Sequence, residues 1–387
     1  MRIGIDCRTI LNPEAGNRAG VAQYTYQLVK TLLKIDKLDE FVLFFDHRAR
    51  GVVKEFLEPN TKIRFFTFSE YKKYLPFFYS HVLTASNIGH EKLDVYHSPA
   101  NIIPFRYNGK FCVTVHDLAI YRRPDLFPSG QGFSVKYLVP RSINNAAKII
   151  AVSESTKKDV EIFFKVDPKK IKVIYEGVDH DRFVPGDKTE KLPEDLKRKY
   201  KISQQYILFV GTLEPRKNLI RLLEAYYQLT QKSLEFKDHY QLVLVGSKGW
   251  LYDEIFEEVE NRNLQNNVVF PGYLVASDLP KLYAHATAFV YPSLYEGFGL
   301  PVLEAMASGT PVITSSVSSM PEIAKDAGLL VDPLDVEGLA NAMEKIITDK
   351  SLQAELSEKG KKRSEKFSWE KCARETLEIY REVGKKA

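Results

Sequence analysis

The sequence predicts an α/β protein of two doubly wound, Rossmann-like domains that face a cleft. Three observations support this. Short apolar runs alternate with longer amphipathic stretches along all 387 residues, as in parallel sheets covered by helices on both faces. The chain is longer than a single hydrophobic core usually supports. A segment rich in proline, glycine and charge, Gly177–Pro193, separates the two halves. We expect domains over residues 1–185 and 190–369, with a helix over about 370–387 crossing back to the first domain.

The apolar runs define the expected strands. In the first half these are Ile3–Ile5, Phe41–Phe45, Ile63–Phe66, Val95–His97, Phe111–Val115, Ile149–Val152 and Lys172–Tyr175. In the second half they are Tyr206–Val210, Gln241–Val245, Val268–Phe270, Ala288–Tyr291, Val312–Thr314 and Leu329–Val331. Helices are expected in the gaps, for example at Gly20–Lys34, Ser153–Phe164, Leu219–Thr230 and Leu300–Ala307.

Composition excludes several classes of protein. Apolar residues make up 44% and charged residues 27%, which is ordinary for a globular chain and excludes a mostly disordered one. No stretch approaches the roughly 20 apolar residues that span a bilayer. The three cysteines, Cys7, Cys112 and Cys372, lie far apart and have neither metal-ligand spacing nor a disulfide pattern. We therefore expect a cytoplasmic protein that requires no metal.

The charge is distributed unevenly along the chain. Residues 1–190 carry 29 basic and 22 acidic residues, whereas residues 191–387 carry 26 and 28. A basic first half suggests an anionic partner there, either a phosphate-bearing substrate or an anionic membrane surface, although a solvated lysine-rich surface is the simpler alternative. No basic-aromatic signature or zinc-finger spacing accompanies the charge, so we expect no nucleic acid partner.

Ligands of doubly wound sheets bind beyond the carboxyl ends of the strands, so the residues after each strand are the candidates. After Tyr206–Val210 comes the sequence GTLEPRKN, in which Gly211 admits a close approach and Arg216 and Lys217 open a helix. Two cations beside helix amides suit a diphosphate, although an ordinary surface loop remains the alternative. After Gln241–Val245, Gly246 and Ser247 form a second small-residue turn, a pattern that many ordinary turns share.

The strongest signal follows Ala288–Tyr291, in the sequence PSLYEGFGLPVLEA. The glycines of this turn would free the backbone amides of Phe298, Gly299 and Leu300 for anionic oxygen. Glu296 in the turn and Glu304 in the helix could then face one ligand, and Glu304 could accept hydrogen bonds from ribose hydroxyls. Acidic side chains at such a turn are costly as structure alone.

The first domain offers weaker candidates. A glycine loop, Ala15–Val21, precedes a helix and could meet phosphate oxygens, although it lacks the G-x-G-x-x-G spacing. His116 follows the strand Phe111–Val115, where it could face the cleft and bind a sugar hydroxyl. His97 sits in a similar position, but a lone histidine is more often structural.

These motifs resemble the retaining glycosyltransferases of family 4, which have the GT-B fold. GTLEPRKN followed by YPSLYEGFGLPVLEAMASGTPVITS carries the resemblance, which extends over essentially the whole chain. The resemblance implies transfer of a sugar from a nucleotide-sugar donor, with no obligatory metal. It places the donor diphosphate at Arg216 and Lys217, the transferred sugar at Glu296, the ribose at Glu304 and a catalytic histidine at His116.

The first glycine loop departs from the family pattern, because Ala19 and Gly20 stand where relatives often have two glycines; Gly20 is the better candidate for a donor contact. The pattern is most similar to bacterial mannosyltransferases of lipopolysaccharide or exopolysaccharide synthesis. That implies GDP-mannose as donor and a glycan or lipid-linked acceptor, with UDP-sugars as the alternative.

Other functions stay open from the residues alone. An NAD-dependent oxidoreductase would share the fold but lacks the fingerprint loop. A sugar-nucleotide epimerase and a non-catalytic nucleotide-sugar-binding protein are further alternatives. The segment Glu70–Leu83 combines aromatic and lysine side chains, which suits peripheral binding at the inner face of a membrane, or else a buried helix.

Overall fold

The computed structural model describes residues 1–11, 20–66, 77–128, 132–186, 192–272 and 274–385. Contacts divide the chain into two compact units. Unit 1 comprises Met1–Pro124, Pro128–Gly177 and Trp369–Ala387, and unit 2 comprises Asp125–Phe127 and Val178–Ser368. The predicted pair of doubly wound α/β domains is confirmed.

Unit 1 is built on a seven-stranded parallel sheet in the order β3-β2-β1-β4-β5-β6-β7. Its strands are β1 (Arg2–Asp6), β2 (Glu40–Asp46), β3 (Thr61–Phe66), β4 (Val95–Ser98), β5 (Phe111–Val115), β6 (Lys148–Ala151) and β7 (Ile171–Val173). Its helices are α1 (Gly20–Ile35), α2 (Phe77–His90), α3 (Ala119–Arg122), α4 (Val139–Asn145), α5 (Glu154–Phe164) and α15 (Trp369–Gly384). Every strand expected in the first half is present.

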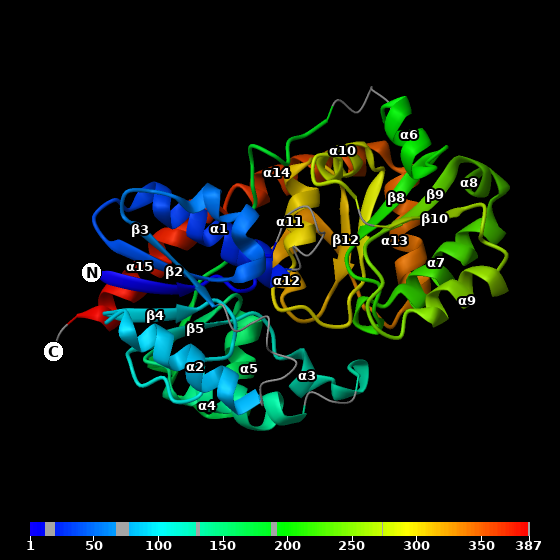
Figure 1. Cartoon of the computed structure of the whole chain (residues 1–387). Helices are drawn as coiled ribbons and strands as arrows, with labels where there is room; N and C mark the ends of the chain where they lie inside the picture. Colours follow the sequence, from blue (N-terminus) through cyan, green and yellow to red (C-terminus); the bar gives the residue numbers. More distant parts are fainter. Residues whose placement is uncertain (12–19, 67–76, 129–131, 187–191, 273, 386–387) are drawn as a thin grey trace. The chain divides into compact units, whose positions relative to one another are not determined.

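Unit 2 is built on a six-stranded parallel sheet in the order β10-β9-β8-β11-β12-β13. Its strands are β8 (Gln205–Val210), β9 (Tyr240–Val245), β10 (Val268–Gly272), β11 (Ala288–Tyr291), β12 (Val312–Ser315) and β13 (Gly328–Val331). Its helices are α6 (Glu194–Tyr200), α7 (Leu219–Lys232), α8 (Leu234–His239), α9 (Asp253–Asn261), α10 (Leu279–His285), α11 (Leu300–Ala307), α12 (Met320–Ala324), α13 (Val336–Thr348) and α14 (Lys350–Ser364). Figure 1 shows α7 and α13 side by side, in agreement with their contacts.

The apolar runs become central strands because helices cover both faces of each sheet. All residues of β5 and of β11 are buried, as are most of those of β8 and β9. The helices are amphipathic, and several begin at a side-chain cap. Ser153, for example, accepts a hydrogen bond from the amide of Thr156 at the start of α5.

The C-terminal helix α15 packs in unit 1, as the sequence predicts, beside α1 and against the central strands. Trp369 at its first residue contacts the ring of Tyr24, with ring centroids 6.0 Å apart. Near its end, the hydroxyl of Tyr380 lies 2.6 Å from Nδ1 of His97 in β4, whose Nε2 lies 2.8 Å from the hydroxyl of Thr114. A buried polar network therefore ties this helix to the sheet.

The contacts place the change of unit at Gly177, earlier than the expected residue 185. Residues just after Gly177 bind within unit 2. The amide of Val178 donates to the carbonyl of Phe367 at 3.3 Å, and the ring of Phe183 packs edge-on against Tyr283. The segment interpreted as a linker is thus partly anchored, because Val178 and Phe183 are buried.

Both sheets reverse their strand order at one point, between β1 and β4 in unit 1 and between β8 and β11 in unit 2. At such a switch point the neighbouring loops leave in opposite directions and open a crevice beyond the strand ends. The switch points are therefore where each unit should bind a ligand.

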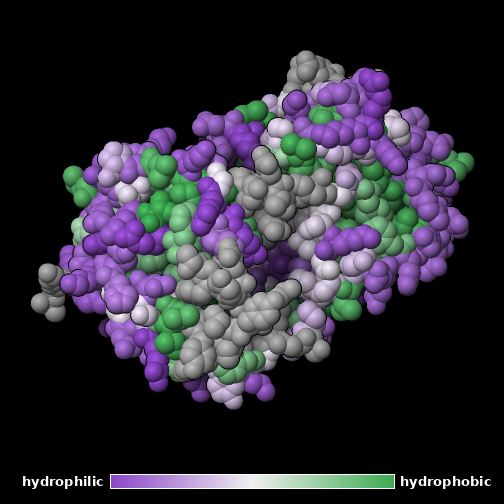
Figure 2. Space-filling view, viewed as in Figure 1, coloured by the Kyte–Doolittle hydropathy of each residue, from purple (hydrophilic) through white to green (hydrophobic). Residues whose placement is uncertain are grey.

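The surface is mainly hydrophilic on the face seen in Figure 2, where apolar residues are interspersed among charged ones. Among the described residues, no helix is both long enough and apolar enough to cross a membrane. Residues 70–76 of the aromatic and lysine-containing segment lie outside the described residues, and the rest of that segment begins α2.

Candidate active site

The loops that follow β8 and β11 meet at the switch point of unit 2. After β8 the chain forms a short 3-10 turn, Pro215–Lys217, and Asn218 then adopts a left-handed conformation (φ 61°) before α7. The carbonyl of Arg216 accepts a hydrogen bond from the amide of Leu294 at 2.9 Å. The Asn218 side-chain amide donates to the carbonyl of Pro292 at 3.0 Å. The two motifs that the sequence analysis selected are thus held against each other.

Arg216, Lys217 and Glu296 form one connected ion cluster. Nζ of Lys217 lies 2.6 Å from Oε1 of Glu296, and Nη1 of Arg216 lies 2.8 Å from Oε2 of the same carboxylate. Nζ of Lys217 also donates to the hydroxyl of Tyr291 at 2.6 Å. All of these side chains are largely buried. The structure therefore brings together three of the predicted site residues, although they come from loops about 80 positions apart.

The electrostatics keep this cluster ionised. Burial would raise the pKa of Glu296, but the charges of Arg216 and Lys217 lower it to about 2. Burial also lowers the pKa of Lys217, assisted by repulsion from Arg216 and opposed by the carboxylates. Glu296 is thus a carboxylate at neutral pH, and the side chains of Arg216 and Lys217 hold it in a buried site.

Glu214 is a member of the cluster that the sequence analysis missed. Its Oε1 accepts from Nε of Arg216 at 3.0 Å and lies 2.8 Å from Nη2. Glu214 is only 3% exposed, and burial raises its pKa above the ordinary value. The sequence signal that could have identified Glu214 is its place two positions before Arg216, a predicted site residue. Glu214 fixes the guanidinium plane from one side, while Glu296 contacts Nη1.

The glycine turn before α11 has a conformation that requires glycine. Gly299 has φ of 116°, and a Cβ there would lie 2.4 Å from the Cε of Met320. The hydroxyl of Ser319 donates to the carbonyls of Glu296 and Phe298 at 3.0 and 2.8 Å, which fixes the turn. Leu300 is the first residue of α11. Amides of a helix's first turn have no partner within the helix, so this end suits anionic oxygen.

Glu304 lies one turn into α11, where it accepts a hydrogen bond from the hydroxyl of Tyr283 at 3.0 Å. Burial raises the pKa of Glu304 to about 7, although Tyr283 and the charge of Arg182 act in the opposite direction. Glu304 is thus separate from the ion cluster in its contacts and in its protonation. The predicted ribose contact favours the ionised form, because a carboxylate accepts hydrogen bonds from hydroxyls more strongly than a carboxylic acid does.

The turns at Gly211 and Gly246 have a packing role. Gly246 has φ of 156°, and a Cβ on it would lie 1.8 Å from the carbonyl oxygen of Gly211. The amide of Leu213 donates to the carbonyl of Ser247 at 2.9 Å, so the loops after β8 and β9 are paired. The side chain of Ser247 is exposed. Gly246 is therefore explained by loop packing, and no contact tests the predicted role of Gly211 or Gly246 in donor binding.

His116, the predicted catalytic histidine, lies in unit 1 just after β5. Its Nδ1 lies 3.0 Å from Oε1 of Glu176, and its Nε2 lies 2.8 Å from the carbonyl oxygen of Pro99. Burial would lower the pKa of His116, but the hydrogen bond and charge of Glu176 raise it above the ordinary value. Because both partners are acceptors, the imidazolium form satisfies both. In this structure His116 is therefore not available to a substrate unless one of these bonds opens.

The other candidate site residues of unit 1 are His97 and Gly20. His97 is fully buried, and burial lowers its pKa to about 3, so its role is structural, as the simpler alternative holds. Gly20 is the exposed first residue of α1. The loop before it, residues 12–19, lies outside the described residues, so the predicted donor contact there is not tested.

Two family models match the chain. "Glycosyltransferase Family 4" matches residues 18–182, and "Glycosyl transferases group 1" matches residues 193–363. The O-antigen chain mannosyltransferase B of Escherichia coli is 35% identical over 288 residues, covering 74% of each chain. The serotype-specific mannosyltransferase WbdA of Escherichia coli is 30% identical over 293 residues, which cover 75% of this chain and 35% of WbdA.

The chain belongs to the glycosyltransferase family that these two models and the mannosyltransferase relatives represent. Among solved structures, the sucrose-phosphate synthase of Thermosynechococcus elongatus superposes with a TM-score of 0.80 and 23% identity over 99% of both chains. WaaG, a glycosyltransferase involved in lipopolysaccharide biosynthesis, superposes with a TM-score of 0.71 and 14% identity. The fold of the glycosyltransferase is therefore GT-B, as the resemblance implied.

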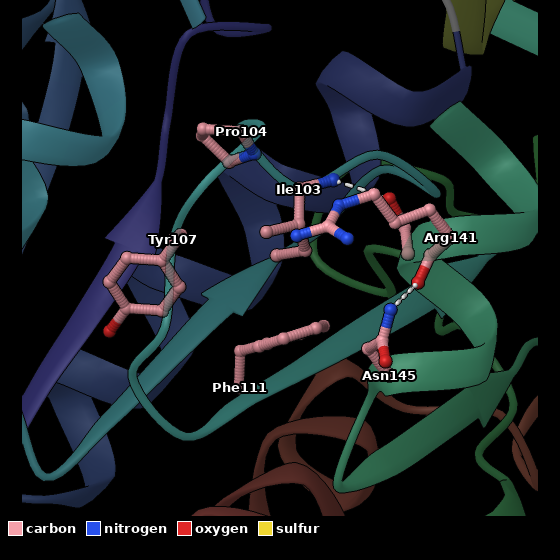
Figure 3. Close-up of a pocket in the computed structure, with 7 residues that line it drawn as sticks. Ile103, Pro104, Tyr107, Phe111, Arg141 and Asn145 are labelled. Carbon is pink, nitrogen blue, oxygen red and sulfur yellow. Dashed lines mark hydrogen bonds between the residues drawn. The ribbon is translucent and has the colours of Figure 1, made fainter. Parts of the chain in front are cut away.

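A cavity of the glycosyltransferase lies in unit 1 behind the loop between β4 and β5. Figure 3 shows Ile103 and Tyr107 on one side and Arg141 and Asn145 of α4 on the other. Its volume of about 20 Å³ holds about one water molecule, not a sugar ring. The side-chain amide of Asn145 donates to the carbonyl of Arg141 at 2.8 Å. This cavity is therefore not a substrate site. Among the described residues, no group of three or more histidine, cysteine or acidic side chains could hold a metal ion.

Proposed function

We propose that this glycosyltransferase moves mannose from GDP-mannose onto a glycan or lipid-linked acceptor during synthesis of a cell-surface polysaccharide. The transferred sugar is supported by the names of the relatives, two of which are O-antigen or serotype-specific mannosyltransferases. Retention of the anomeric configuration follows from the resemblance to family 4. The acceptor would bind in unit 1 and the donor in unit 2.

The main support for a donor site in unit 2 is the cluster of Arg216, Lys217 and Glu296 at its switch point. Two buried cations beside the start of α11 would bind the diphosphate of the donor, together with the amides of Phe298, Gly299 and Leu300. Glu304, on the same helix, would bind the ribose. The same arrangement has no evident use in hydride transfer, which makes an oxidoreductase a poor alternative.

The chemistry follows from where charge develops. As the anomeric C–O bond breaks, negative charge grows on the nucleoside diphosphate and positive charge on the sugar. Arg216 and Lys217 would stabilise the leaving group without reorganising, because Glu214 and Glu296 already hold them. Glu296 would orient sugar hydroxyls and face the developing positive charge. The acceptor would attack from the side that the diphosphate leaves, and the departing phosphate would take the acceptor proton.

His116 would assist on the acceptor side. With Nδ1 fixed by Glu176, its Nε2 would exchange the carbonyl of Pro99 for a sugar hydroxyl. We further propose that the enzyme needs no metal ion and works in the cytoplasm, at the inner face of the membrane when its acceptor is lipid-linked.

A donor screen tests the proposal. Nucleotide sugars with guanine and uracil bases would first be ranked by thermal shift, since a ligand that binds only the folded state raises Tm. The best donor would then be incubated with glycan and lipid-linked acceptors, and products separated by mass. Transfer from GDP-mannose supports the proposal. Transfer only from a UDP-sugar would show that the donor is a UDP-sugar and not GDP-mannose. Tight binding without any turnover would indicate a non-catalytic binding protein.

A further inference from the structure

Near the switch point of each unit the chain carries an acidic residue, one intervening residue and then an arginine. In unit 1 Asp6 is the last residue of β1 and Cys7 and Arg8 follow it, whereas in unit 2 Glu214-Pro215-Arg216 begins in the loop that leaves β8 at Val210. Strands β1 and β8 hold equivalent places, because each lies beside the strand at which the order reverses. Arg8 and Arg216 therefore both lie in the loop that leaves the strand at the switch point, although Arg8 lies nearer to the end of its strand.

Asp6 holds Arg8 from the side. Nε of Arg8 donates to Oδ1 of Asp6 at 2.8 Å, and Nη2 donates to Oδ2 at 2.5 Å. The amide of Arg8 donates to Oδ1 at 3.1 Å, and the guanidinium lies 5.2 Å from the ring centroid of Phe66. Asp6 is 7% exposed, whereas the side chain of Arg8 is 35% exposed. The guanidinium is thus fixed in orientation and still reachable.

A clasp through Nε and Nη2 leaves the end of the guanidinium, with one N–H on each Nη, pointing away from Asp6. That pair of parallel N–H groups matches two oxygens of a phosphate or carboxylate. In unit 2 the corresponding Nη1 of Arg216 contacts an anion supplied by the protein itself, Oε2 of Glu296, in the loop after β11. Unit 2 therefore shows that an arginine held in this way by a neighbouring carboxylate binds an anion through its Nη1.

Among the described residues of unit 1, Asp46 at the end of β2 interacts with Arg8 through its charge, but no carboxylate accepts a hydrogen bond from Nη1 of Arg8. The strand equivalent to β11 is β4, which ends at Ser98 and is followed by Pro99 and Ala100, neither of them acidic. Nη1 of Arg8 makes no hydrogen bond to any residue that the structure describes. The place that Glu296 fills in unit 2 is thus left, in the described part of unit 1, for an external anion.

We propose that Arg8, oriented by Asp6, binds a phosphate group of the acceptor and selects acceptors that carry one. The inference rests on the proposed function, because it assigns unit 1 to the acceptor. It narrows the acceptor from any glycan to one that bears a phosphate near the reacting sugar, as a short lipid-linked oligosaccharide does. The excess of basic residues over residues 1–190, 29 against 22 acidic, favours an anionic ligand in this half.

The chain offers a matched control at the next strand. Asp46 and Arg48 after β2 repeat the same clasp, with Nε of Arg48 donating to Oδ1 of Asp46 at 2.9 Å. The side chain of Arg48 is 63% exposed, and β2 lies one strand away from the switch point. Arg48→Gln removes the same charge from the same local structure at the neighbouring strand, where Asp46 interacts with Arg8 through its charge.

The test compares two acceptors that differ only in phosphate: a lipid-linked diphosphate oligosaccharide in detergent, and the same oligosaccharide as a methyl glycoside. A soluble phosphate ester of the oligosaccharide separates recognition of phosphate from recognition of the lipid. For Arg8→Gln we expect the KM of both phosphate-bearing acceptors to rise at least about tenfold. The KM of the methyl glycoside and of the donor should change less than about twofold. Arg48→Gln should behave as the wild type.

Arg8→Lys gives a second variant that keeps the charge and removes the paired N–H groups, and it should resemble Arg8→Gln. If Arg8→Gln does not fold, the KM values of Arg8→Lys for the same acceptors test the proposal. An equal rise in KM for all acceptors, a rise only for the lipid-linked one, or no rise at all overturns the proposal. Binding of the phosphate ester to the enzyme with GDP present, measured by calorimetry, is independent of which sugar is transferred. Failure of GDP-mannose as donor is therefore distinguishable from failure of this inference.

Discussion

The carboxylate of Glu296 lies 2.6 Å from the ammonium nitrogen of Lys217, and neither side chain is more than 9% exposed. The same carboxylate reaches Arg216 through its other oxygen. A buried carboxylate and two cations are stable together only because each neutralises the desolvation cost of the others. The diphosphate site of the proposed function is thus assembled before the donor arrives, and each of its members can be tested.

Replacement of Glu296 by glutamine should abolish most of the turnover. The amide keeps the shape of the side chain but loses the charge that would face the developing positive centre. Loss of one such electrostatic contact costs on the order of 10²–10³ in kcat. Binding of GDP, measured by calorimetry, should not weaken, because the two cations remain. Near-normal turnover by this variant would rule out the proposed role.

Replacement of Arg216 and Lys217 by glutamine should weaken GDP binding as well as turnover. Charge-assisted hydrogen bonds contribute about 1.5–3 kcal/mol each, so each single variant should lose roughly tenfold or more in affinity. Lys232→Gln is the control, since Lys232 is exposed on unit 2 and pairs only with Glu344 among the described residues. Unchanged GDP affinity in both single variants would contradict the diphosphate assignment.

The donor affinity should rise with pH around neutrality. The pKa of Glu304 is about 7, raised mainly by burial, and the carboxylate is the stronger acceptor for the proposed ribose hydroxyls. Because this folded-state pKa lies above that of the unfolded chain, the wild type should lose stability relative to Glu304→Gln as pH rises from about 4.5 to 7. Calorimetric Kd and Tm, recorded from pH 5.5 to 8.5 for both proteins, check the two expectations. A flat pH profile of Kd for the wild type would contradict the ribose role.

Transfer should continue in excess EDTA. Arg216 and Lys217 supply the positive charge that a divalent ion provides at the diphosphate in other enzymes. The initial rate would be measured with EDTA, then after adding magnesium or manganese. Complete loss in EDTA that either ion restores would show that the two cations are not sufficient.

The strands were predictable from sequence because a strand buried on both faces needs an unbroken apolar run, as in Phe111–Val115. The members of the site were predictable from position after those strands. Their pairing was not, because the contact between Lys217 and Glu296 depends on β8 lying beside β11 across a crossover of about 80 residues. Likewise His116 was located correctly after its strand, while its partner Glu176 lies 60 positions away.

The role of Glu214 escaped notice for a different reason. An acidic residue near two basic ones suggests a solvated charge pair, and only its burial shows that it fixes Arg216. The change of unit at Gly177 escaped because prolines and charges mark where a chain is exposed, whereas Val178 and Phe183 within that stretch are buried.

The place of α15 has a consequence for how the protein is made. Unit 1 is discontinuous, and its last helix is translated after the whole of unit 2. Until Trp369–Gly384 leaves the ribosome, His97 has no Tyr380 for its Nδ1, and the Tyr24 ring has no Trp369. All residues of unit 2 therefore precede the helix that completes unit 1. A released chain truncated before residue 369 should resist proteolysis over residues 178–368 and be sensitive at its beginning.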